Sequence, residues 1–134
     1  GEDQPQVDAK IRALGIGEWV IQAGVRTNVP DYYHAFDCFL MPSEFEGSPI
    51  TLVEAQGCGL KCFASTSVPP DGAVTDLVQF LPEGSSAETW ADTVQKSVTP
   101  APHPDAWPAL QTAGYEQNAA AKAMQALYDQ LVTR

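Results

Sequence analysis

The fold is decided by residues 37–65, which read DCFLMPSEFEGSPITLVEAQGCGLKCFAS. The nearly continuous apolar run at 37–41 ends at Pro42 and is typical of a parallel strand covered on both faces. Apolar residues at helical spacing then predict a helix over 49–56, and a second apolar run predicts a strand over 62–65. A strand, a helix and a strand in this order indicate a βαβ unit with a parallel sheet.

The α/β pattern continues on both sides of this stretch. Before it, spacing and caps predict a helix over 5–14 ended by Gly15, a strand over 19–23, and a helix over 28–36 with Asn28 as N-cap. After it, they predict a strand over 77–81 and a helix that Ser85 and Glu88 open as a capping box. After a proline-rich connector at 99–108, we expect an amphipathic helix within 115–131, whose apolar face includes Ala120, Met124, Leu127, Tyr128 and Leu131. The chain is expected to be one domain, 1–134, with a C-terminal helical segment over about 104–133.

The composition is that of a globular domain. The 134 residues are 44% hydrophobic and 18% charged, and no apolar run reaches the ~20 residues that a membrane span needs. Seven Lys and Arg against seventeen Asp and Glu give a formal charge of −10, which argues against nucleic acid as a partner and against a basic membrane anchor. A phosphorylated small molecule stays compatible, because a helix N-terminus can hold it without lysine.

The three cysteines, Cys38, Cys58 and Cys62, are too few for a disulfide scaffold and fit a reducing cytosol. A zinc site that uses Cys58 and Cys62 is the alternative interpretation. Neither histidine, His34 or His103, lies at a ligand spacing from these two cysteines, so buried small hydrophobic side chains explain them better.

A candidate site lies in the loop between the first strand of the βαβ unit and its helix. Open α/β sheets bind ligands at the carboxyl ends of their strands. The free amides of Ser48, Ile50 and Thr51 would face an incoming anion. Pro49 has no N–H to lose at the helix start, and Gly47 lacks a Cβ, which would let a phosphate approach the backbone closely.

Two glutamates accompany this loop. Glu46 lies within it, and Glu54 follows on the helix, where its carboxylate could accept hydrogen bonds from two vicinal hydroxyls such as those of a ribose. The spacing alone is not specific, because an acidic chain contains such pairs by chance. A buried salt bridge or a solvated helix start would explain the two carboxylates equally well.

Several stretches in a fixed order resemble one protein family. PSEFEGSPITLVEAQGCGL (42–60), with Glu46 and Glu54, resembles the signature of the retaining GT-B glycosyltransferases of the group-1 family, which use nucleotide sugars. The stretch before it, VIQAGVRTNVPDYYHAFDCFLMPS (20–43), resembles the family's strand, base-contacting loop and helix. FASTSVPPDGAVTDLVQFLP (63–82) and AGYEQNAAAKAMQALYDQL (113–131) resemble its exopolysaccharide and capsule branch.

The resemblance implies a fold and a set of roles. The fold is a parallel Rossmann-like sheet with flanking helices, as part of the C-terminal, donor-binding domain of a GT-B enzyme. Glu46 would be the catalytic-site carboxylate, against the donor sugar and its diphosphate. Residues 47–50 would supply amides near the phosphates, and Glu54 would hold the ribose hydroxyls. Val25 and Arg26 match the loop beside the nucleobase, although a plain surface charge explains Arg26 equally well.

Three positions depart from the family pattern. Lys61 stands where proline is usual, Thr66 where aspartate is common, and Asp71 where glutamate is common. These changes bear on details of donor choice and not on the fold.

The resemblance also implies parts that this sequence does not contain. Family members carry an N-terminal Rossmann domain that binds the acceptor, and an Arg/Lys pair that neutralises the diphosphate. We therefore expect the chain to be the distal, N-terminally truncated part of a donor-binding domain, inactive alone. The whole enzyme would act in the cytoplasm, at the inner face of the membrane. It would transfer a sugar, with UDP as the expected carrier, to a glycan or lipid-linked acceptor with retention.

No metal or other cofactor is expected, because the sequence offers no DxD-type carboxylate cluster. Two alternatives to a transferase stay open. A sugar-nucleotide epimerase of the GT-B type fits the order of the motifs less well. A non-catalytic interaction domain would keep the fold and the motif as a relic.

Overall fold

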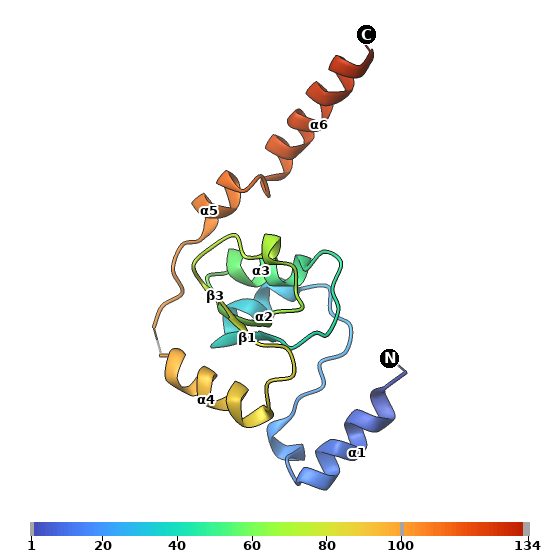
Figure 1. Cartoon of the computed structure of the whole chain (residues 1–134), viewed down its shortest axis with the longest axis vertical. Coiled ribbons are helices and arrows are strands. Elements are labelled where there is room, and N and C mark those ends of the chain that lie inside the picture. Colours follow the sequence, from blue (N-terminus) through green and yellow to red (C-terminus); the bar gives the residue numbers. More distant parts are fainter. Residues whose placement is uncertain (1, 100, 133–134) are drawn as a thin grey trace.

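Three parallel strands in the order β1-β2-β3 form the centre of the protein (Figure 1). The computed structural model describes residues 2–99 and 101–132. Its elements are α1 (Gln4–Leu14), η1 (Gly17–Trp19), α2 (Val29–Ala35), β1 (Cys38–Met41), α3 (Ile50–Gly57), β2 (Lys61–Ser65), η2 (Pro70–Gly72), β3 (Val78–Leu81), α4 (Ala87–Ser97), α5 (Trp107–Thr112) and α6 (Gln117–Val132). The α/β class and the parallel sheet predicted from the sequence are confirmed.

The register brings the strand ends together at one edge. Met41 of β1 lies beside Ala64 of β2, and Ser65 lies beside Leu81 of β3. All three strands run in the same direction, so the loops that follow them gather at this carboxyl edge. Helix α3 covers one face of the sheet and α4 lies on the opposite side (Figure 1).

The main core lies between the sheet and α3. Leu52 and Ala55 of α3 are fully buried against Cys62 and Ala64 of β2, and Tyr33 of α2 closes the cluster from the side. A second, smaller cluster joins α3 to α5 and contains Val53, Ala106 and Leu110. The helix α3 is therefore held on two sides, and residues on its remaining surface have fixed positions.

Gln56 is a fully buried polar side chain on α3. Its Nε2 donates hydrogen bonds to the carbonyls of Leu52 (2.9 Å) and Gly72 (2.7 Å). Its Oε1 accepts from the amides of Val74 and Thr75, both at 3.0 Å, and from the Thr75 hydroxyl at 2.9 Å. One side chain thus satisfies the backbone of the segment between β2 and β3 and fixes that segment on α3.

The same segment packs on the residue at which α3 starts. A Cβ added at Gly72 would collide with Cγ of Pro49, the buried N-cap residue of α3. Only glycine permits this close approach. The loop that precedes α3 therefore packs against η2, and η2 is held by its hydrogen bond to Gln56.

The strand predicted over 19–23 is wrong. Trp19 ends η1, and the residues that follow it pair with none of the three strands. Trp19 and Ile21 are 86% and 91% exposed. An apolar, β-branched run becomes a strand only beside a hydrogen-bonding neighbour, and the described residues provide none here.

Three smaller expectations also need correction. The strand predicted over 37–41 is not covered on both faces, since Leu40 is 48% exposed. Ser86, not Ser85, is the N-cap of α4, and its Oγ accepts from the Thr89 amide at 3.3 Å. Asn28 occupies the N-cap position of α2, but its side chain donates to Asp31 Oδ2 at 3.0 Å instead of capping the helix.

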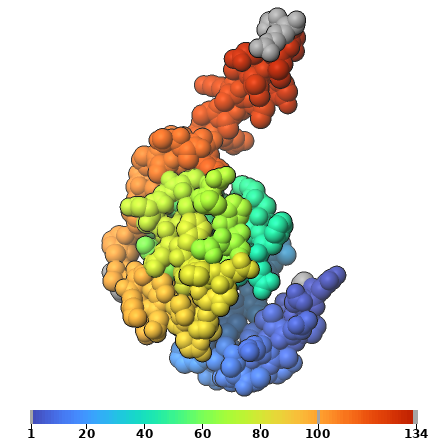
Figure 2. Space-filling model, in the orientation of Figure 1, coloured from blue at the N-terminus to red at the C-terminus, as the bar shows by residue number. Residues whose placement is uncertain are grey.

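The last helix stands away from the body of the protein (Figures 1 and 2). None of its described residues is buried, and Met124, Leu127 and Tyr128 are about half exposed. The predicted apolar face of this helix is thus an exposed surface. The C-terminal helical segment predicted over about 104–133 contains α5 and α6. Thr133 of that segment and Pro100 of the connector lie outside the described residues. Within the described ranges, no helix combines the length and the apolar character needed to cross a bilayer.

Replacing Gln56 by Met should destabilise the protein strongly. Met keeps the length of the side chain but leaves the amides of Val74 and Thr75 without their acceptor, and an unsatisfied buried polar group costs roughly 1–3 kcal/mol. We expect the free energy of unfolding, measured by urea denaturation, to fall by at least about 2 kcal/mol. The matched control is Gln95→Met on the exposed side of α4, which should change it by less than about 0.5 kcal/mol. Equal effects of both substitutions would contradict the role of Gln56.

Candidate functional site

The loop between β1 and α3 forms the centre of the candidate site at the carboxyl edge of the sheet. Strand β1 ends at Met41 because Pro42, with no N–H, cannot continue the ladder. The loop then crosses the edge and re-enters the protein at Pro49, which is buried. Between these two prolines, the chain is exposed or half-buried, so its polar groups are accessible to a ligand.

Glu46 is held in this loop by a hydroxyl group. Ser43 Oγ donates to Glu46 Oε1 at 2.9 Å, and the side chain of Glu46 is half-buried. The Ser43 carbonyl in turn accepts a hydrogen bond from Ser65 Oγ at the end of β2. The carboxylate is thus tied through one residue to the sheet, while its Oε2 has no recorded partner among the described residues.

The amides at the start of α3 are only partly as expected. The Ile50 amide donates to the Ser48 carbonyl at 2.9 Å, so the prediction that it is free is wrong. The local turn at Pro49 (ψ 63°) bends the chain enough to close this contact. For the amides of Ser48 and Thr51, no acceptor is recorded within the described residues, and Gly47 has open space around the position of a Cβ.

Glu54 lies on the exposed side of α3, one helical turn beyond Ile50. Its Oε2 accepts a hydrogen bond from the Tyr33 hydroxyl of α2 at 3.2 Å. Tyr33 is itself 4% exposed, and burial together with the negative charge of Glu54 raises the pKa of Tyr33 to about 12. The tyrosine therefore stays a neutral hydrogen-bond donor that orients the carboxylate.

A pocket of about 230 Å³ adjoins Glu54. Its other walls come from α2, the end of α3 and α5: Val29, Pro30, Tyr33, Gly57, Cys58, Trp107 and Leu110. An apolar pocket beside an exposed carboxylate suits a ligand with a flat ring and adjacent hydroxyls. Sequence reasoning missed Tyr33 and Trp107. Tyr33 could be found from its helical spacing to Val29, but nothing local points to Trp107 in the proline-rich connector.

Val25 and Arg26 lie in the loop before α2. Val25 is 96% exposed, and Arg26 is exposed and makes no hydrogen bond or ion pair with any described residue. Their loop leads into the helix that carries Tyr33. Helix α2 thus follows the loop of Val25 and Arg26 and carries the tyrosine that binds Glu54. The structure records no direct contact between Glu54 and either Val25 or Arg26.

The cysteines are free thiols. Cys62 is fully buried in the core, and burial raises its pKa to about 12, as expected for a small hydrophobic side chain. Cys38 and Cys58 are half-buried. In residues 2–99 and 101–132, no group of three or more His, Cys, Asp and Glu side chains lies close enough to share a metal ion.

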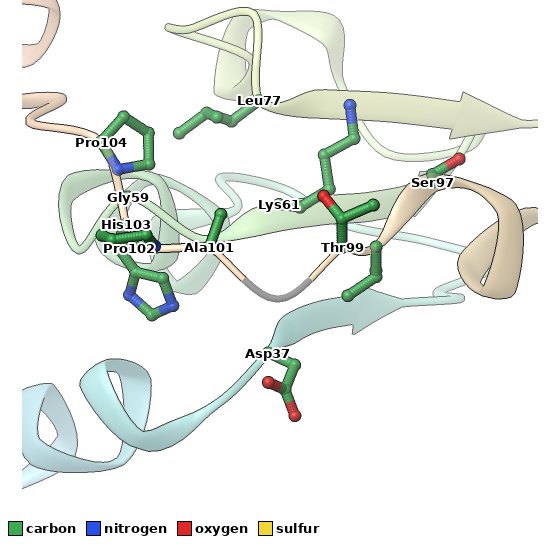
Figure 3. A pocket seen from close by; sticks show the side chains of 11 residues that line it. Asp37, Gly59, Lys61, Leu77, Ser97, Thr99, Ala101, Pro102, His103 and Pro104 are labelled. Atoms are coloured by element: carbon green, nitrogen blue, oxygen red, sulfur yellow. The ribbon is translucent and has the colours of Figure 1, made fainter.

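A pocket of about 190 Å³ lies at the opposite, amino-terminal edge of the sheet (Figure 3). The carbonyl of Pro104 packs directly on Gly59 beside it, which leaves no room for a side chain there. Figure 3 shows the charged ends of Lys61 and Asp37 pointing in opposite directions. Because its charged groups do not converge, this pocket is a weaker candidate than the carboxyl edge.

Comparison with known proteins gives a match over most of the chain. The family model described as "Glycosyl transferases group 1" matches residues 1–107. The protein named "Putative glycosyltransferase EpsF" of Bacillus subtilis (strain 168) is 31% identical over 93 residues, which are 69% of this chain and 24% of that protein. The lipopolysaccharide core biosynthesis mannosyltransferase LpsB of Rhizobium meliloti (strain 1021) is 33% identical over 86 residues, or 64% of this chain and 22% of that protein.

A third relative is the UDP-Gal:alpha-D-GlcNAc-diphosphoundecaprenol alpha-1,3-galactosyltransferase of Escherichia coli. It is 43% identical over 52 residues, which are 39% of this chain and 13% of that protein. No solved structure gives a significant match. The chain thus spans about a quarter or less of the length of these three relatives.

The raised pKa of Tyr33, which burial and the charge of Glu54 cause, can be tested through the pH dependence of stability. Because the pKa of Tyr33 is raised from 10 to about 12, its stabilising contribution is complete below pH 10 and is lost as the pH rises toward 12. Between pH 8 and pH 11 we expect the wild-type protein to lose about 1 kcal/mol more free energy of unfolding than Tyr33→Phe. Tyr128→Phe, at an exposed tyrosine, should lose as much as wild type. Identical pH profiles for Tyr33→Phe and wild type would refute the raised pKa of Tyr33.

Proposed function

This chain belongs to the glycosyl transferases group 1 family, and from that premise we propose that it binds the nucleotide-sugar donor of a retaining GT-B enzyme. Glu46 faces the donor sugar and its diphosphate. The backbone of residues 47–51 approaches the phosphates, and Glu54 holds the ribose hydroxyls. Val25 and Arg26 lie beside the nucleobase. Glycosyl transfer itself is the activity of the family.

One observation carries this proposal. Glu46 and Glu54 each accept a single hydrogen bond, from Ser43 and Tyr33, through one carboxylate oxygen. The other oxygen of each has no recorded partner among the described residues. Each carboxylate is thus oriented by one hydrogen bond and keeps an oxygen that can accept another. Such acceptors are suited to the hydroxyl groups of a sugar and a ribose.

The phosphates need positive potential, which the acidic chain supplies only locally. The free amides of Ser48 and Thr51 and the dipole of α3 provide it at the start of the helix. These groups would stabilise the departing nucleoside diphosphate without a metal ion. The remaining charge would be neutralised by basic residues of the whole enzyme. We propose that the isolated chain, without those residues and an acceptor-binding domain, does not catalyse transfer.

The names of two relatives state what those proteins act on. One acts in lipopolysaccharide core synthesis, and another takes UDP-Gal to a diphosphoundecaprenol-linked acceptor. We propose by this analogy a UDP-sugar donor and a glycan or lipid-linked acceptor in exopolysaccharide or capsule synthesis. The whole enzyme would work in the cytoplasm at the inner face of the membrane.

Nucleotide titration tests the donor site. We expect UDP to bind the isotopically labelled chain with a Kd in the millimolar range, shifting the NMR signals of residues 47–54. Glu54→Gln keeps the volume but removes the charge, and a charge-assisted hydrogen bond contributes roughly 1.5–3 kcal/mol. The Kd should therefore rise about tenfold. The control Glu18→Gln, at an exposed glutamate of η1, should leave the Kd unchanged. If UDP, GDP, ADP and TDP all shift nothing near α3, an interaction domain becomes the better interpretation.

The role of the amides can be tested with a chelator. If backbone amides and not a metal ion hold the phosphates, excess EDTA should leave the Kd of UDP within about twofold of its value with magnesium or manganese. The signals of Ser48 and Thr51 should be among those that shift. Binding that appears only after a divalent cation is added would contradict this mechanism.

A further inference from the structure

Helix α6 carries an apolar face that the described part of the chain leaves uncovered. The helix projects from the body of the protein beyond α5 (Figures 1 and 2). None of its residues from Gln117 to Val132 is buried, and Met124, Leu127 and Leu131 are about half exposed. Most of the stability of a helix in a protein comes from the packing of its apolar face. The face of α6 is therefore open to a partner that would stabilise the helix.

The spacing along this face indicates what kind of partner fits. Successive intervals of three, four, three and four residues separate Gln117, Ala120, Met124, Leu127 and Leu131. This is the seven-residue repeat with which two helices pack along their length. We call these five residues the α6 stripe. Its repeat favours a second helix as the partner.

The distribution of charge favours another copy of α6 in the antiparallel direction. Lys122 and Asp129 are the charged residues of Gln117–Val132, and the helical period places both on the side opposite the α6 stripe. The helix is thus neutral in a chain of formal charge −10, and pairing would desolvate no charge. An antiparallel pair keeps the two acidic bodies at opposite ends of a helix about 24 Å long, well beyond the Debye length of about 8 Å at physiological salt. A parallel pair would bring them side by side.

The α6 stripe is also complementary to itself in this direction. The intervals of four, three and four from Ala120 to Leu131 read the same from either end. Two antiparallel copies can therefore place Met124 of each opposite Leu127 of the other, and Ala120 of each opposite Leu131 of the other. Each layer then combines a smaller or more flexible side chain with a branched one, and two-fold symmetry closes the pair.

We propose that α6 is a homodimer interface, in which the helix pairs antiparallel with α6 of a second copy about a two-fold axis near residues 125 and 126. Two helices of this length bury less than the 1,200–2,000 Å² of a standard stable interface, so the dimer is weak and reversible. None of the residues that we assign to the nucleotide-sugar donor lies on α6. The dimer and the donor site can therefore be tested separately.

Sedimentation equilibrium of the chain from about 10 µM to about 1 mM tests the dimer, and we expect a monomer–dimer equilibrium with a Kd inside this range. Met124→Glu places a charge in the middle of the α6 stripe and should raise the Kd at least about tenfold. The matched control, Ala126→Glu, adds the same charge at an exposed position on the opposite side of the helix and should leave the Kd nearly unchanged. Glutamate is a strong helix former, so neither substitution disfavours the helix itself.

Nuclear Overhauser contacts between copies test the direction of the pair. One copy carries protonated alanine methyl groups and the other protonated leucine methyl groups, each in a deuterated background, so every alanine–leucine contact is intermolecular. The antiparallel pair should give a contact between Ala120 and Leu131. In a parallel pair these two residues lie about 16 Å apart along the axis and give none.

Three results would overturn the proposed dimer. The first is a chain that stays monomeric at about 1 mM, which would leave the face of α6 to another part of the whole enzyme. The second is a dimer that Met124→Glu weakens no more than Ala126→Glu does. The third is a dimer without the contact between Ala120 and Leu131. Nucleotide binding at residues 47–54 has no bearing on any of the three.

Discussion

The buried amide of Gln56 is the interaction on which the rest of the candidate site depends. It satisfies the backbone of residues 72–75 from within α3, so that η2 can press against Pro49. Without the side-chain amide of Gln56, five hydrogen bonds would be lost at once, of which two are buried and three are partly buried. The start of α3, where the phosphates of a donor are proposed to lie, is thus fixed by a side chain that no ligand touches.

The sequence predicts those parts of the fold that local patterns determine. The helices α1, α2 and α3 and the strands β1, β2 and β3 are found within a residue or two of their predicted bounds. The strand predicted over 19–23 does not form, because a strand needs a hydrogen-bonding neighbour and the sequence of the run itself does not supply one. The N-cap of α4 shifts by one residue, because Ser85 closes the preceding turn by donating to the Pro82 carbonyl and the adjacent Ser86 caps the helix.

The two candidate carboxylates can be named from the sequence, but the groups that orient them cannot. Glu46 and Glu54 are singled out by the resemblance of their stretch to the family signature, whereas the hydroxyls of Ser43 and Tyr33 reach them only through the folded chain. The Ile50 amide, which is expected to be free, donates to the Ser48 carbonyl within a tight turn. No sequence pattern predicts the geometry of this turn. Backbone amides supply positive potential at the start of α3, and the carboxylates of Glu46 and Glu54 supply hydrogen-bond acceptors. This division suits a ligand with phosphates at one end and hydroxyls at the other.

The outer side of β1 has a consequence for the behaviour of the protein in solution. Within the described residues, β1 pairs with β2 alone, so its other edge presents unpaired amide and carbonyl groups, with Leu40 half exposed nearby. Such an edge is a template on which another extended chain can pair, and natural proteins usually protect it with charges, bulges or a covering segment. We therefore expect intermolecular strand pairing along β1 to limit the solubility of this chain. A charged residue at position 40 is the simplest change that should reduce aggregation in concentrated samples.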